Sequence, residues 1–308
     1  MNFAQFQKEN SINQVEKRAR SVTRLGIRQP LKALSPISLK PQLDSIDQKD
    51  STDPQRIGYL ATEIFGSLLS EEPSSTPSPN YMSFQPSINY KMRAILIDWL
   101  ISVHLKFRMM PETLYLTVNI IDRYLEKKAV EKKVLQLVGV SALLVAAKYE
   151  EIYPPRLRDL IYITDKAYSK QQILKMESDI LKALAFNVTV PSSWRFLERF
   201  SRLAELDERG FSLGRYLCEL ALVEYHMLRH KPSCVAAAAV YISLKLFKAK
   251  NPWPNHLVDH SKYSEESIKE CAKDLLVLFQ AAHKHTLTAV VSKFSKKEFY
   301  VVANITIS

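Results

Sequence analysis

The chain contains a stretch, Leu137 to Ala147, that is apolar on almost every side of the helix it would form. It is too short to span a bilayer, which takes about 20 apolar residues. A helix without a polar face has to be covered by other helices. The stretch therefore predicts an all-α domain built around one central helix.

Amphipathic helical patterns surround this central stretch. In each of them apolar residues recur at spacings of three and four, and Ser169 is a candidate N-cap for the last. Together with the central helix they predict a five-helix domain over residues 91–188. The five predicted helices cover residues 92–107, 111–127, 132–148, 156–163 and 169–184.

The same plan returns in residues 189–300. Cys234–Phe247 is a second nearly all-apolar segment, preceded by a proline, and this indicates an internal repeat. We therefore expect two tandem five-helix domains, followed by a short C-terminal tail at 301–308.

The segment before the first repeat, residues 53–90, predicts one helix and a connector. Asp53 is a candidate N-cap, Pro54 suits the first helical position, and apolar residues recur with helical spacing as far as Leu69. Residues 71–80 contain three prolines, which predicts a connector without helix. Residues 1–52 are polar and without periodicity, which predicts a disordered tail.

Composition excludes several classes of protein. With 308 residues, 46% hydrophobic and only 6 Gly, the chain suits a helical globular protein of two domains. The net charge is +11, but Lys and Arg are scattered, so we expect no direct nucleic-acid binding. The N-terminal residues have no secretory pattern, and we expect no membrane association and a location in nucleus and cytoplasm.

No group of residues resembles a catalytic centre, a phosphate-binding loop or a metal site. The cysteines Cys218, Cys234 and Cys271 show no paired spacing and fall in apolar helical segments, so they are interpreted as reduced core thiols. We therefore expect no enzyme activity, no cofactor and no metal.

Three short motifs carry a family resemblance. They are the run Met92-Arg93-Ala94-Ile95-Leu96-Ile97-Asp98-Trp99, the segment Leu135–Glu151, and the helix around Glu177. Together they resemble a cyclin box, and residues 196–202 and 289–299 are most similar to B-type mitotic cyclins. The resemblance implies two tandem cyclin-box folds. It also implies a non-catalytic subunit that binds and activates a cyclin-dependent serine/threonine kinase and controls the G2/M transition and mitosis.

The resemblance assigns two surfaces. On the first, Lys148 and Glu177 would form an ion pair that holds a regulatory helix of the kinase in its active position. The implied kinase-binding residues are Lys148, Glu177, Tyr149, Glu151, Ile152, Tyr153 and Phe186. The second is a docking patch for substrates or inhibitors bearing an Arg-x-Leu motif. Its implied residues are Met92, Ile95, Leu96, Trp99, Leu135 and Gln136.

Two polar features qualify these surfaces. Ser102 stands where some cyclins carry an acidic residue that holds the arginine of the motif, which predicts weaker or differently selective docking. Arg93 and Asp98 are the polar members of the first helix and are interpreted as an internal salt bridge.

The polar tail contains two candidate degradation motifs. Lys8-Glu9-Asn10 is a KEN sequence, and Arg28 and Leu31 form an RxxL sequence that resembles a destruction box. Either can arise by chance in a polar segment, but the resemblance implies capture by a ubiquitin ligase of the anaphase-promoting type. Ser35, Thr76 and Ser78 each precede proline and are candidate phosphorylation sites.

Two other functions stay open on the sequence. A transcription factor IIB-like protein also stacks two cyclin folds and binds DNA, but the tail has no cysteines for its zinc ribbon. A transcriptional cyclin is the other alternative, and the KEN sequence and the run from Met92 to Trp99 argue against it.

Overall fold

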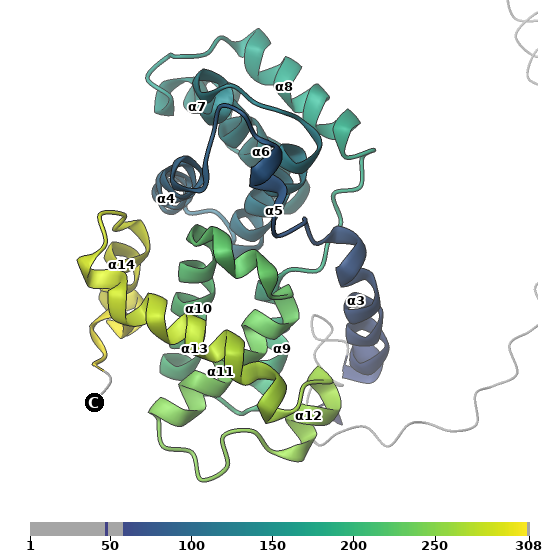
Figure 1. Cartoon of the computed structure of the whole chain (residues 1–308), viewed down its shortest axis with the longest axis vertical. Coiled ribbons are helices and arrows are strands. Elements are labelled where there is room, and N and C mark those ends of the chain that lie inside the picture. The colour runs from purple at the N-terminus through teal and green to yellow at the C-terminus, as the bar shows by residue number, and fades with distance from the viewer. Residues whose placement is uncertain (1–46, 49–57, 307–308) are drawn as a thin grey trace, which may run out of the picture. The chain divides into compact units, whose positions relative to one another are not determined.

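The computed structural model describes residues 47–48 and 58–306 (Figure 1). Regular structure within these residues is entirely helical, as the sequence predicted. The helices form two groups that follow one another along the chain, α4–α8 and then α9–α13 (Figure 1). None of the described helices is both long and apolar enough to cross a bilayer.

The first repeat matches its predicted helices closely. Its helices are α4 (Tyr90–Phe107), α5 (Pro111–Lys127), α6 (Leu135–Glu150), α7 (Leu157–Ile163) and α8 (Lys170–Ala183). The central helix α6 packs against α4, α5 and α8 and is buried from Leu137 to Ala147. Ser169 caps α8 as predicted, with a reciprocal bond from its own backbone N–H to the side chain of Gln172.

The second repeat has the same plan. Its helices are α9 (Ser193–Leu203), α10 (Glu208–Val223), α11 (Pro232–Leu246), α12 (Asn255–Ser261) and α13 (Glu265–Ala281). The central helix is α11, which is buried from Ser233 to Ser243 and packs against α9, α10 and α13. A further short helix, α14 (Ala289–Phe294), packs against α4 and α10 and so links the two repeats.

The N-terminal helix α3 (Ala61–Ser75) follows a 3-10 turn, Gly58–Leu60, and ends six residues later than the predicted end at Leu69. The prediction that the prolines exclude helix from residue 71 onward is wrong, because Pro73 lies inside the last turn of α3. There its missing N–H costs only one bond near the helix end. The buried carboxylate of Glu72 accepts hydrogen bonds from Ser233 N and Oγ at 2.6 and 2.8 Å, which holds this turn. The predicted N-cap, Asp53, lies outside the described residues.

The predicted tail also needs correction at its C-terminal end. Asp47 is buried, and its carboxylate lies 2.5 Å from the guanidinium of Arg199 on α9. The interpretation of all of residues 1–52 as a disordered tail is therefore wrong at Asp47. The KEN and RxxL sequences lie outside the described residues.

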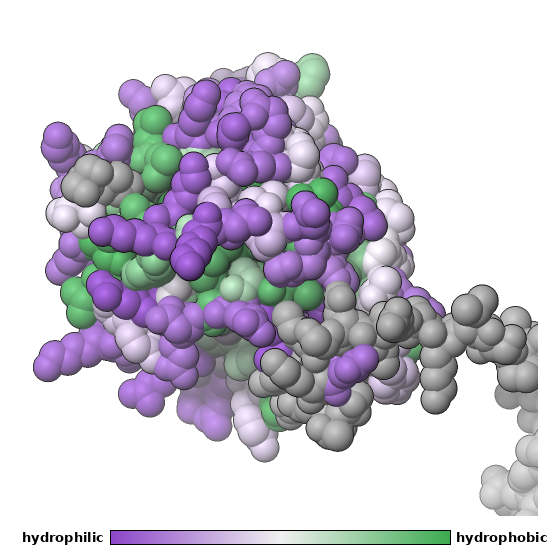
Figure 2. Space-filling view, turned by 90° about the horizontal axis from the view of Figure 1, so that it is seen from below, coloured by the Kyte–Doolittle hydropathy of each residue, from purple (hydrophilic) through white to green (hydrophobic). Residues whose placement is uncertain are grey.

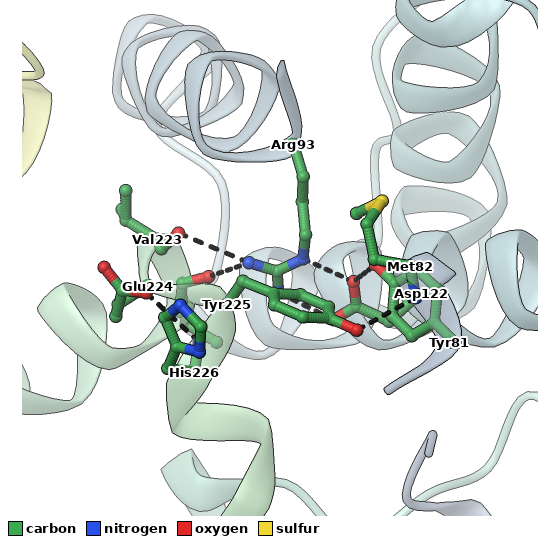
Figure 3. Close-up of polar contacts among 9 residues, drawn as sticks. Tyr81, Met82, Arg93, Asp122, Val223, Glu224, Tyr225 and His226 are labelled. Carbon is green, nitrogen blue, oxygen red and sulfur yellow. Dashed lines mark hydrogen bonds and ion pairs between the residues drawn. The ribbon is translucent and has the colours of Figure 1, made fainter. Parts of the chain in front are cut away.

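A buried ion pair joins α4 to α5 and to the second repeat (Figure 3). Arg93 Nε and Nη2 lie 2.6 and 2.7 Å from the two carboxylate oxygens of Asp122. Arg93 Nη1 donates to the carbonyls of Leu222 and Val223 at 3.1 and 3.3 Å. The predicted Arg93–Asp98 bridge is wrong, because side chains five residues apart on a helix point to different sides. Asp98 instead accepts a hydrogen bond from the backbone N–H of Ala289, at 2.9 Å.

Candidate protein-binding surfaces

The structure brings Lys148 and Glu177 together, as the resemblance implied. Lys148 lies in the last turn of α6 and Glu177 in the middle of α8, and these two helices pack side by side. Lys148 Nζ is 2.6 Å from Glu177 Oε1, with side-chain exposures of 48% and 12%. An ammonium group has three N–H donors, so this pair leaves Lys148 able to donate to a partner as well.

Large apolar side chains are exposed close in sequence to this ion pair. The exposed fractions are 48% for Tyr149, 87% for Ile152, 92% for Tyr153 and 66% for Phe186. These residues lie at the ends of helices and in short loops and form no core of their own, which makes them a candidate interaction surface. We call Lys148, Glu177 and these four residues the α6–α8 surface.

Backbone conformation presents Phe186 to solvent. Ala185 and Phe186 both have left-handed backbone angles, φ 50° and 59°, and the N–H of Phe186 bonds to the carbonyl of Leu181 at 2.9 Å. A non-glycine residue in this region costs roughly 1–2 kcal/mol. The buried side chain of Leu184 anchors the turn, so that the chain reverses and Phe186 points outward.

Glu151 has an intramolecular contact that the sequence did not predict. Its Oε1 accepts hydrogen bonds from Met110 N at 2.7 Å and from Thr113 Oγ1 at 2.5 Å. The carboxylate thus lies at the N-terminus of α5, where a negative charge is stabilising. Glu151 fixes the loop after α6 against α5, and one of its oxygens is already occupied.

The predicted docking residues meet at the contact of α4 with the start of α6. Leu96 and Leu135 are buried, Met92, Trp99 and Gln136 are half-buried, and Ile95 is exposed. The close approach depends on Gly139, since an added Cβ there would lie 2.7 Å from Leu96 Cδ1. These six residues, called the α4–α6 patch below, therefore form a core contact whose outer edge reaches solvent. Ser102, one turn beyond Asp98 on α4, is exposed.

The end of the molecule formed by the second repeat exposes both hydrophobic and hydrophilic residues (Figure 2). Figure 2 shows it from below, with hydrophobic residues in a broken band between hydrophilic side chains. Val277 on α13 is a large apolar residue of this repeat that is well exposed. It serves below as a comparison for the α6–α8 surface.

Sequence reasoning missed one group of side chains. The structure brings Cys234 and Cys271 together with His230, and Cys218 is not a member of this group. The interpretation of all three cysteines as free and buried is confirmed. The available signal was the spacing of His230 and Cys234, four residues apart, while Cys271 lies on another helix and its proximity depends on the fold.

Comparison with known proteins identifies the family. The family model described as "Cyclin, N-terminal domain" matches residues 63–189, and "Cyclin, C-terminal domain" matches residues 191–308. The chain belongs to the cyclin family. The first matched segment contains the first helical repeat and the second segment contains the second. The prediction of two tandem cyclin-box folds is therefore confirmed.

Relatives of this cyclin include several plant B-type cyclins, as residues 196–202 and 289–299 predicted. Cyclin-B2-1 of Oryza sativa subsp. japonica is 46% identical, over 82% of this chain and 60% of its own length. G2/mitotic-specific cyclin-1 of Medicago sativa subsp. varia is 42% identical, over 84% of this chain and 60% of its own length. Cyclin-A1-1 of Arabidopsis thaliana is 41% identical, over 86% of this chain and 59% of its own length. The aligned part of this cyclin thus spans about 60% of the length of these relatives.

Solved structures share its fold. A viral cyclin from herpesvirus saimiri has a TM-score of 0.63 at 21% identity and covers 70% of this chain and 96% of its own. A chain of the yeast RNA Pol II CTD kinase CTDK-1 complex has a TM-score of 0.55 at 17% identity. The match covers 71% of this chain and 73% of that chain. At these identities the likeness concerns the fold alone.

Proposed function

We propose that this cyclin is the regulatory subunit of a cyclin-dependent serine/threonine kinase and activates that kinase at the G2/M transition. The observation that carries the proposal is the α6–α8 surface, where an accessible ion pair joins two helices and four exposed apolar side chains lie at or just beyond the C-terminal ends of these helices. Aromatic residues beside charged groups are the usual hot spots of protein interfaces. The name of the Medicago relative, a G2/mitotic-specific cyclin, supports the timing.

The activation is indirect. A protein kinase transfers phosphate only when a lysine–glutamate ion pair in its smaller lobe is formed and its activation loop is open. A partner that binds this arrangement more tightly than the inactive one shifts the population toward it without contacting the phosphate. Lys148 would donate to backbone carbonyls of the kinase, and Glu177 would hold the ammonium in place. The cyclin itself performs no chemistry.

The same proposal assigns the α4–α6 patch to substrates or inhibitors that carry an Arg-x-Leu motif. The exposed side chain of Ile95 and the half-buried Met92 and Trp99 offer an apolar contact for the leucine. Ser102 offers no charge to the arginine, so the motif would bind mainly through apolar contacts.

We further propose that the KEN sequence, Lys8-Glu9-Asn10, and the RxxL sequence of Arg28 and Leu31 mark the protein for a ubiquitin ligase of the anaphase-promoting type. Degradation through these motifs would limit the kinase activity to mitosis. The protein would act in both nucleus and cytoplasm.

Substitution of the ion pair tests the kinase proposal. Tagged full-length protein with Lys148→Ala and Glu177→Ala is recovered from dividing cells, and bound proteins are identified by mass spectrometry while histone kinase activity is measured. We expect the kinase and its activity to be lost with helix content unchanged by circular dichroism. The matched control is Glu266→Ala with Lys269→Ala, an exposed pair on α13 at 2.6 Å, which should retain both. Full kinase activity in the first variant would refute the interface, and recovery of DNA or basal transcription factors would refute the function.

A further inference from the structure

Two cysteines and a histidine converge where α11 meets α13. Cys234 lies in the first turn of α11, His230 directly precedes that helix, and Cys271 lies on α13. One imidazole nitrogen and the two Sγ atoms all lie within 4.8 Å of one another. Both cysteines are buried and free of disulfide bonds, and His230 is half-buried. The cluster is separate from the α6–α8 surface and the α4–α6 patch.

The two thiols lie in a buried, hydrogen-bonded setting. A hydrogen bond from the Cys271 thiol lowers the pKa of Cys234, partly offset by burial and by the carboxylates of Glu72 and Glu270. The same hydrogen bond, followed by burial, raises the pKa of Cys271. Cys234 also lies at a helix N-terminus, where the partial positive charge stabilises an anion.

A carboxylate orients the histidine. His230 Nε2 lies 2.6 Å from Asp274 Oδ2, and Asp274 also binds the guanidinium of Arg229. Arg229 Nε also lies 3.2 Å from His230 Nε2, so this ring nitrogen has two charged neighbours. In the tautomer in which Nε2 donates its hydrogen to Asp274, Nδ1 carries the lone pair that can bind a cation. A carboxylate bonded to the other ring nitrogen is the usual companion of a metal-binding histidine. Asp274 is one turn from Cys271 on α13, so a single helix supplies both a sulfur and the orienting group.

We propose that His230, Cys234 and Cys271 form a binding site for a thiophilic divalent cation, with Zn²⁺ as the ion that fits this ligand set. Two thiolates and one imidazole are a common set for zinc, and a water completes the tetrahedron. Binding forms two Zn–S bonds and one Zn–N bond and releases to solvent the protons still held by the two sulfurs. Zn–S bonds of about 2.3 Å require the sulfurs to lie roughly 3.8 Å apart, so the ligands need only a small closure.

A bound ion would have a structural role. His230 lines a cavity that Arg93, Asp122 and Pro232 also line, and the two cysteine ligands lie outside that lining. A bound ion would cross-link α11 to α13. It would also stiffen the first turn of α11, where Ser233 holds Glu72 of α3. The site therefore stabilises the second repeat and the attachment of the N-terminal helix.

Metal titration of the full-length protein tests the site. The reduced protein is stripped with a chelator, then titrated with Zn²⁺ against a chromophoric chelator and, separately, with Co²⁺. We expect one equivalent of Zn²⁺, and a Co²⁺ spectrum with sulfur-to-cobalt charge transfer and tetrahedral ligand-field bands. Cys234→Ser and Cys271→Ser should each weaken binding by at least about 100-fold, and Asp274→Asn by about 10–100-fold.

Two further variants control for the loss of any buried thiol and for misfolding. Cys218→Ser removes a buried thiol outside the cluster and should bind as the wild type does. His230→Asn replaces a half-buried side chain, keeps both core thiols, and should lose the histidine contribution while circular dichroism stays unchanged. The proposal is overturned if the wild type binds no Zn²⁺ or if Cys234→Ser binds it equally well. It is also overturned if the protein forms a Cys234–Cys271 disulfide on mild oxidation but takes up no metal when reduced.

Discussion

Arg93 and Asp122 form a two-pronged ion pair in the interior, with side chains only 1% and 2% exposed. Burial alone would lower the pKa of Arg93, but the Asp122 carboxylate more than offsets this and raises it. Tyr81 donates to the same carboxylate at 2.7 Å, and Arg93 also donates to two carbonyls of the second repeat. The pair thus connects α4, α5 and the end of α10 through one guanidinium (Figure 3).

Arg93→Met should destabilise the fold strongly. The substitution leaves the Asp122 charge buried without its partner, which typically costs about 3–5 kcal/mol. Urea unfolding followed by circular dichroism measures this loss. Lys269→Ala removes one member of an exposed pair on α13 and should change the free energy of unfolding by less than about 1 kcal/mol. A similar small loss for both variants would contradict the structural role of Arg93.

His104 should make the fold sensitive to mild acid. Burial, with the nearby charge of Lys293, lowers the pKa of His104 to about 4 from its ordinary value of 6.5. Its Nε2–H donates to the carbonyl of Met110 at 2.8 Å, and the low pKa keeps the buried ring neutral at pH 7. Between pH 6.5 and pH 4 the unfolded chain binds the proton more readily, and stability falls as the pH falls.

The loss from this one group should be on the order of 2 kcal/mol between pH 7 and pH 5. His104→Gln keeps a hydrogen-bond donor but cannot titrate, so the difference between wild type and variant isolates this contribution. Urea unfolding of both proteins across this pH range provides the measurement. Parallel pH profiles for the two proteins would rule the prediction out.

The exposed apolar part of the α6–α8 surface should contribute to kinase affinity. Ile152→Ala with Tyr153→Ala removes two side chains that contact little within the chain, so stability should hardly change. Affinity for the kinase should fall by about 10–100-fold, as for truncated hot-spot residues. Val277→Ala removes an exposed apolar residue of the second repeat and should bind like the wild type. Surface plasmon resonance with the kinase identified by pull-down decides between these outcomes.

Ser102→Glu should strengthen docking of Arg-x-Leu peptides. An exposed carboxylate at this position adds a charge-assisted bond to the arginine, worth about 1 kcal/mol or a several-fold gain at a solvated site. Lys106 is four residues further along α4 and competes for the new carboxylate. Ser102→Gln has similar size without charge and should give no gain in fluorescence polarisation. An equal gain in both variants would indicate that shape, and not charge, matters.

The KEN sequence should be tested by substitution and not by removal of the whole tail. Deletion of residues 1–52 would also remove Asp47 and leave Arg199 buried without its partner. Replacement of Lys8, Glu9 and Asn10 by alanine avoids this effect. We expect the protein to persist after mitotic exit in a cycloheximide chase, while scrambling residues 11–13 should leave turnover unchanged. Unchanged turnover in both would show that the KEN sequence is not used.

The sequence predicted what depends on local patterns. The bounds of α5 follow from Pro111 at its start, and α6 is recognisable because it is apolar all round. The extension of α3 through Pro73 was missed because a contact with Ser233, far along the chain, stabilises that turn. The partner of Arg93 was missed for the same reason, since Asp122 lies on another helix.

The candidate sites also include one that the sequence predicted and one that it did not. Lys148 and Glu177 were paired through the family resemblance, and the packing of α6 on α8 accounts for their contact. The group of His230, Cys234 and Cys271 has only a weak signal in the sequence, because one ligand is supplied by a different helix. Its assembly depends on the packing of α11 on α13.

The contact of α3 with the second repeat has a consequence for the order of folding during synthesis. Glu72 and Ser233 are 161 residues apart, and Phe65 of α3 lies against Phe196 at a ring separation of 6.4 Å. At roughly 5–20 residues per second, a ribosome takes on the order of ten seconds or more to add the chain between Glu72 and Ser233. The first turn of α11 cannot receive Glu72 until it has left the exit tunnel. The helix that emerges before both repeats is therefore among the last to dock.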